Sequence, residues 1–124
     1  METNTRFAMI YQLSDNIISS LGFTSEENYA AVKEGVSGLK YYETAFDLPE
    51  GLMASRINDE VLEDAFFSIK TKSKVSYTRF EKAAIVSAYR ALEKTNINPA
   101  GDNVLFILST TKGNVELLDR NKSK

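Results

Sequence analysis

A short polar turn after an apolar run is the stretch of this sequence best suited to ligand binding. Residues 104–108 read VLFIL, which is typical of a buried strand, and residues 109–114 read STTKGN. Backbone amides at a helix start attract anions such as phosphate. The common phosphate-binding loop, however, requires GxxxxGK followed by Ser or Thr, and here a single glycine follows the lysine. Two interpretations stay open: a weak nucleotide site, or small residues that let a strand pass into a helix without clashes.

The residue types needed for most enzyme chemistry are missing. The chain has no cysteine and no histidine, which excludes thiolate nucleophiles, disulfides, the usual zinc sites and imidazole bases. Carboxylates of a glycosidase or metal site must converge from separate elements, whereas capping of helix starts accounts for acidic residues such as Glu26, Glu27 and Glu60. We therefore expect no catalytic residue, no metal site and no cofactor in this chain.

Length and charge narrow the class of protein further. The chain has 124 residues with 15 basic and 17 acidic side chains, a net charge of −2, which suits one globular domain. Nucleic acid is not an expected partner because phosphate neutralisation needs a basic patch. No apolar run approaches the ~20 residues that span a membrane, and residues 1–13 lack the pattern of a secretory signal. We expect a cytoplasmic protein.

Three helices are predicted from their capping signals. In a capping box a Ser or Thr hydroxyl accepts a hydrogen bond from the backbone three residues on, and an acidic side chain there reaches back. Thr and Glu stand in this relation at 24–27 and again at 78–81, and Asn58 can cap another helix. Gly35 ends the first helix in the left-handed conformation. The predicted helices are 24–34, 58–69 and 77–95.

Two apolar runs, 7–13 and 104–108, predict strands that are buried on both faces. Because a long helix lies between them, they imply a parallel pair with a right-handed helical crossover and an α/β fold. Residues 36–57 show no sustained period and predict an irregular connection. The helix at 77–95 is expected to pack on this sheet, and the residues predicted to contact it are Phe80, Ala84, Ala88 and Leu92.

Two parallel strands form an incomplete sheet. They need cover on both faces, and each leaves an open edge that can pair with another chain. Residues 1–124 are therefore interpreted as the N-terminal part of a larger α/β domain. For the chain by itself we expect a dimer or larger homo-oligomer.

The order of the motifs resembles the start of a β-ketoacyl-acyl carrier protein synthase. DNIISSLGFTSEENYAAVKEGVSGL, residues 15–39, is similar to that family's G-x-V-S-P-L-G segment, its helix with a central aromatic residue (here Tyr29) and its x-G-x-S-G-I/L turn. Residues 76–99 resemble the helix with R-x-x-x-x-A-x-x-A-x-x-A-L-x-x-A/S-G. Residues 103–114 stand where the family has a strand ending in a G-[ST]-x-x-G-G turn. The resemblance spans roughly residues 6–118.

This resemblance implies a partial thiolase-like fold, the start of the first of two similar α/β halves that usually form a homodimer. It also implies decarboxylative Claisen condensation of acyl and malonyl thioesters on acyl carrier protein, in fatty acid or polyketide-type biosynthesis. The family's catalytic cysteine and histidines follow the matched region, so this chain alone is expected to be inactive. An alternative is a non-catalytic interaction module or partner subunit of a condensing enzyme.

The resemblance also assigns a role to the turn quoted first. It implies that Thr110, Thr111, Lys112 and Gly113 border the acyl-substrate region. Lys112 stands where many family members place an apolar residue that lines the acyl tunnel, and burying an unpaired ammonium there would be unfavourable. The chain therefore resembles a divergent member.

Overall fold

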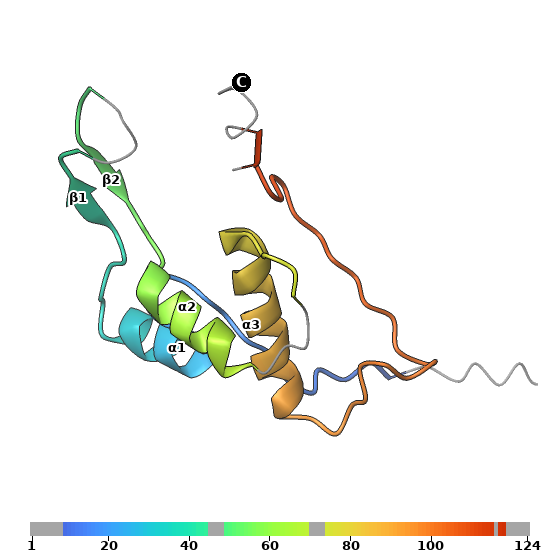
Figure 1. The fold of residues 1–124 in the computed structure, drawn as a ribbon. Coiled ribbons are helices and arrows are strands. Elements are labelled where there is room, and N and C mark those ends of the chain that lie inside the picture. Colours follow the sequence, from blue (N-terminus) through green and yellow to red (C-terminus); the bar gives the residue numbers. More distant parts are fainter. Residues whose placement is uncertain (1–8, 45–48, 70–73, 116, 119–124) are drawn as a thin grey trace, which may run out of the picture.

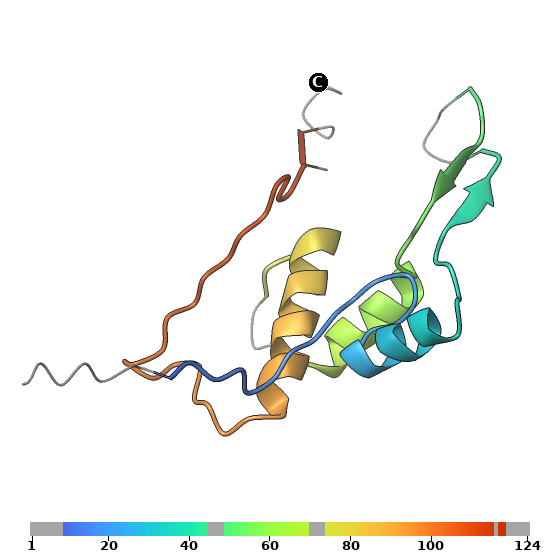
Figure 2. The same cartoon turned by 180° about the vertical axis from the view of Figure 1, so that it is seen from behind.

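The structure, a computed structural model, describes residues 9–44, 49–69, 74–115 and 117–118. Within them the chain has mixed α and β structure: three helices and one two-stranded sheet. The helices lie together, the sheet stands at one side of them, and residues 104–110 run as an extended arm at the other side (Figures 1 and 2). The elements are α1 (Ser25–Lys33), β1 (Lys40–Tyr42), β2 (Leu52–Ala54), α2 (Asp59–Ser68) and α3 (Arg79–Glu93).

All three predicted helices are present, and their caps are the predicted ones. At α1 the Thr24 hydroxyl accepts from the Glu27 amide at 3.1 Å, and the Glu27 carboxylate accepts from the Thr24 amide at 3.0 Å. Thr78 begins α3 with the same capping box, and the Asn58 side chain caps α2. Gly35 follows α1 with φ of 72°, the left-handed conformation that glycine adopts without strain. The local sequence therefore determines where each helix begins.

The core lies between α2 and α3. Leu62 and Phe66 from α2 and Val86 from α3 are its buried apolar residues among those described. The Tyr77 ring meets Phe66 edge-on, with ring centroids 5.4 Å apart, a favourable aromatic geometry. The partly buried side chains packed around this core are Ile18, Phe23, Ile57, Ala65, Ile69, Tyr77, Ala83 and Ile85.

A buried asparagine holds the loop before α1. Asn28 is 7% exposed, and its Nδ2 donates to the carbonyls of Ile17, Gly22 and Thr24 at 3.1, 3.1 and 2.8 Å. Its Oδ1 accepts from the Ser19 hydroxyl. One side chain thus gathers the backbone of residues 17–24, a segment with little regular structure of its own.

Two contacts attach this loop and α1 to α3. The Asn16 Nδ2 donates to Ser87 Oγ at 3.2 Å, and Ser87 Oγ donates back to the Asn16 carbonyl at 3.3 Å. At the far end of α3, Lys94 donates to Glu26 at 2.8 Å. The N-terminal loop is thereby held against α3 through polar contacts at two separate points.

The prediction of an irregular connection over residues 36–57 is wrong in part, since it contains a β-hairpin. β1 and β2 are antiparallel. A Cβ on Gly51 would lie 2.9 Å from the Tyr42 carbonyl oxygen and against the Tyr41 ring, so a larger residue there would require the hairpin to shift. The paired residues are Lys40 with Ala54, Tyr41 with Met53 and Tyr42 with Leu52.

The predicted parallel strands are not seen. Residues 9–13 and 104–108 belong to no strand, while 7 and 8 lie outside the described residues. Ile10 is 96% exposed, Leu105 81% and Ile107 79%. An apolar run becomes a strand only where a neighbour takes up its backbone hydrogen bonds, and neither run has such a neighbour in the described chain. After Gly113 the sequence also favours a helix, and most of that stretch lies outside the described residues. Leu117 and Leu118 are helical, and their amides donate to the carbonyls of Asn114 and Val115 at 3.0 Å.

Candidate functional site

An apolar groove lies between α3 and the extended arm. Its volume is about 660 Å³, and the arm contributes Phe106 and Leu108, two side chains that share one face of an extended segment. On the opposite wall the helix presents the face that was predicted to pack on residues 104–108. The two walls are not packed against each other, and the volume between them is open. The predicted helix residues that line this groove are Phe80, Ala84, Ala88 and Leu92.

The polar turn beyond the groove folds on itself. The Thr110 hydroxyl oxygen accepts from the Lys112 amide at 3.4 Å and from the Gly113 amide at 2.9 Å. Gly113 has φ of 54°, in the left-handed region that favours glycine. These two amides therefore have hydrogen-bond partners within the turn. Among the described residues that line the groove, none comes from the predicted set Thr110, Thr111, Lys112 and Gly113.

Asn114 connects this turn to the start of α3. Its Oδ1 accepts from the Thr78 hydroxyl at 2.6 Å, and its Nδ2 donates to Glu81 Oε1 at 2.7 Å. The second oxygen of Glu81 accepts from the Thr78 amide at 2.8 Å. We call Thr78, Glu81 and Asn114 the polar clamp. Sequence reasoning missed Asn114, because nothing in the sequence relates it to a capping box that begins 36 positions earlier.

The polar clamp lowers the pKa of Glu81 below its ordinary value of 4.5. The main cause is the hydrogen bond from the Thr78 amide, followed by the one from the Asn114 side chain. Both donors favour the charged carboxylate. A carboxylate whose pKa is depressed in the folded state stabilises the fold above the unfolded pKa, and this contribution is lost as pH falls through the folded pKa.

Replacing Asn114 by alanine is expected to raise the pKa of Glu81 and to weaken the dependence of stability on acid pH. Native protein and variant should therefore differ more in urea midpoint at pH 7 than at pH 3. Nuclear magnetic resonance titration of the Glu81 carboxyl gives the pKa directly. Asn103→Ala, which removes an exposed asparagine from a neighbouring turn, is the matched control. A Glu81 pKa that is the same in both variants would contradict this role for Asn114.

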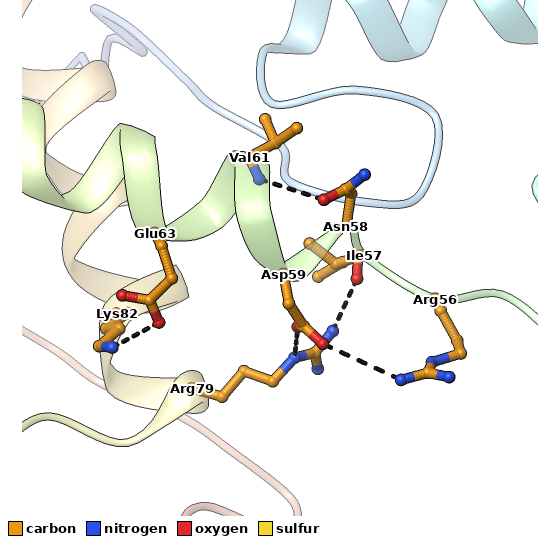
Figure 3. Close-up of polar contacts among 8 residues, drawn as sticks. All are labelled: Arg56, Ile57, Asn58, Asp59, Val61, Glu63, Arg79 and Lys82. Carbon is orange, nitrogen blue, oxygen red and sulfur yellow. Dashed lines mark hydrogen bonds and ion pairs between the residues drawn. The ribbon is translucent and has the colours of Figure 1, made fainter. Parts of the chain in front are cut away.

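A second polar cluster lies at the start of α2 (Figure 3). Asp59 is placed between two arginines, with Arg56 Nη2 at 3.9 Å and a closer contact to Arg79. Arg79 also donates to the Ile57 carbonyl at 2.9 Å. These groups are about half exposed, and such pairs add little stability. The cluster joins the beginnings of α2 and α3, so we interpret it as structural.

The carboxylates considered for catalysis have structural partners. Glu26 binds Lys94, Glu27 completes a capping box, and Glu63 binds Lys82 at 2.5 Å. Within the described residues, acidic side chains nowhere gather in a group of three or more that could hold a metal ion.

Two further findings concern the chain as a whole. In the described ranges, no helix has both the length and the apolar character needed to cross a membrane. The groove, the turn at residues 109–114 and the polar clamp are the features on which a functional proposal can be based. Comparison of the chain with protein-family models, with curated proteins and with solved structures gives no match.

Proposed function

We propose that this chain is the N-terminal part of a cytoplasmic β-ketoacyl synthase-like protein, and that its groove holds an acyl chain. The ordered motifs at 15–39, 76–99 and 103–114 support the family. The observation that supports acyl binding is the groove itself, because its volume of about 660 Å³ lies within the roughly 300–1,000 Å³ typical of small-molecule sites. Apolar walls with few polar groups suit an alkyl chain.

The groove has a direction that matches a thioester. Ala84 and Ala88 leave room along α3, where Phe106 and Leu108 face them from the arm. The charged residue of the lining is Glu81, in the first turn of α3, and it belongs to the polar clamp. We propose that the alkyl chain lies along the alanines and that its carbonyl end is directed toward the turn at 109–114. Condensation would require a thiolate and imidazoles, which this chain does not contain.

Acyl pantetheine thioesters of increasing length should bind with increasing affinity. Each buried methylene contributes about 0.8 kcal/mol, so the dissociation constant should fall about fourfold per methylene until the groove is filled. Isothermal titration calorimetry with butanoyl to dodecanoyl pantetheine measures this series. Affinity that does not depend on chain length would contradict an acyl site.

A substitution that fills the groove tests where the ligand lies. Ala88→Phe places a ring against the alkyl chain and should weaken dodecanoyl pantetheine binding at least tenfold, the order of magnitude expected when two or more methylenes are displaced. Ala100→Phe makes the same change in an exposed turn outside the groove and should leave binding unchanged. Equal affinities of the two variants would remove the groove from the proposal.

A non-catalytic interaction or partner subunit of a condensing enzyme is the second candidate. The exposed apolar side chains of residues 9–13 and 104–108 favour it, because contiguous apolar surface often marks an interface. Acyl carrier protein remains a proposed partner under either function. The natural coding sequence distinguishes them: a synthase has a cysteine and histidines encoded after Lys124, and a partner subunit lacks them.

A further inference from the structure

We propose that residues 104–110 pair as an antiparallel strand with the same residues of a second copy of this chain, in a register centred on Ile107. The backbone of residues 105–109 has no hydrogen-bond partner anywhere in the described chain. Leu105, Phe106, Ile107 and Leu108 are each 63–81% exposed. A long apolar segment with unpaired N–H and C=O groups is a template for another strand. This inference does not depend on acyl binding.

The charges at the two ends of this segment match a second copy. Residues 103–111 contain no charge, Asp102 precedes them and Lys112 follows. Both charged residues lie five positions from Ile107, in the turns that flank the segment. Antiparallel pairing about Ile107 therefore brings the turn that holds Asp102 of each copy to the same end of the ladder as the turn that holds Lys112 of the other. Opposite charges facing across a ladder are stabilising, and like charges are destabilising. A parallel pairing in register would instead place each charge against its own kind.

The same register also places apolar side chains opposite apolar side chains. Phe106 meets Leu108 of the other copy, so the apolar residues that face α3 remain neighbours on one face of the ladder. Pairing uses the backbone edges of the segment rather than its faces. The groove in each copy is therefore left open. The arm that forms one wall of the groove in one copy lies beside the corresponding arm of the other copy, so the two grooves share a continuous wall.

A single cysteine at the symmetry axis tests this register, since the native chain has none. Facing residues of an antiparallel pair have Cα atoms about 4.5–5.5 Å apart, within the range that a disulfide spans. Ile107→Cys should therefore form a disulfide-linked dimer on mild oxidation. Leu105→Cys is the control: its two copies would lie about 13–14 Å apart along the ladder. The cross-linked fraction should be at least tenfold lower for Leu105→Cys.

Charge exchange gives an independent readout in sedimentation equilibrium. In Lys112→Asp, a carboxylate of one copy lies near the Asp102 carboxylate of the other, and this happens twice in each dimer. The dissociation constant of the dimer should therefore rise about tenfold. The double variant Asp102→Lys/Lys112→Asp restores both pairs and should return the dissociation constant to within about twofold of the native value. A monomeric native chain, equal cross-linking at positions 105 and 107, or a double variant that fails to restore the dimer would each overturn the proposal.

Discussion

Replacing Leu62 by alanine is expected to reduce the free energy of unfolding by about 3 kcal/mol, within the range of 2–5 kcal/mol for a buried leucine. Leu62 is 1% exposed and lies between Phe66 and Val86, the other buried apolar residues in the described chain. Removal of its side chain leaves a cavity in the apolar interface between α2 and α3. Domains of this size have total stabilities of about 5–15 kcal/mol, so the variant should be largely destabilised.

Urea denaturation followed by circular dichroism measures this loss. Leu39→Ala is a matched control because Leu39 is 55% exposed, and surface changes usually alter stability by no more than about 0.5 kcal/mol. Leu62→Met conserves volume and should cost less than about 1.5 kcal/mol. Equal effects of alanine at positions 39 and 62 would show that the packing of α2 on α3 does not hold the fold together.

The second large effect is expected at Asn28, where alanine should cost about 2 kcal/mol. The Asn28 side chain donates to three carbonyls, and two of them have a second donor. The Gly22 carbonyl also accepts from the Ser19 amide, and the Thr24 carbonyl also accepts from the Asn28 amide. Among the described residues the Ile17 carbonyl accepts only from the Asn28 side chain, and the Ser19 hydroxyl donates to the Asn28 Oδ1 that alanine would remove. Asn28 itself is 7% exposed, and each hydrogen bond that its side chain makes contributes about 0.5–1.5 kcal/mol.

Aspartate at the same position gives a sharper test of this arrangement. In Asn28→Asp a carboxylate oxygen replaces the amide donor and faces three carbonyl oxygens, so the folded state should raise the pKa of the new carboxyl. The penalty is then largest at neutral pH and is relieved as pH falls through that raised pKa. Stability that rises on acidification relative to Asn28→Ala is the expected result. Asn103→Ala, at an exposed position, controls for loss of an asparagine side chain.

Helix starts could be predicted from the sequence, because a cap is a contact within four residues. Thr24, Asn58 and Thr78 all begin helices at the predicted positions. The hairpin was missed because its strands are three residues long, too short to show an alternating pattern. The available signal was the Pro49-Glu50-Gly51 stretch between two short runs that contain aromatic or apolar residues, since Pro and Gly mark turns.

The errors arose where structure depends on distant partners. Residues 104–108 have the composition of a buried strand, yet burial requires neighbours that the described chain does not provide. The four residues of α3 that were predicted to share a face do line one groove, because a helical period is fixed by its own sequence. The sheet on which they were predicted to pack is not seen, and the buried residue of α3 is Val86. The contact of Asn114 with Glu81 could not be predicted, since 33 residues separate them and no local pattern records such a contact.

The sequence separation between contacting segments of the helical core also determines which contacts can form first while the chain is being synthesised. The ends of α2 and α3 that face the linker are only about a dozen residues apart in sequence, whereas the Asn16–Ser87 contact joins residues 71 positions apart. Closing a short loop loses less chain entropy than closing a long one, and local contacts form sooner. On the ribosome the α2–α3 pair can thus form as soon as residue 93 emerges, before the arm has left the exit tunnel. The helical pair then presents a surface onto which residues 14–24 fold back, so this loop, although synthesised before either helix, is among the last segments to take its place.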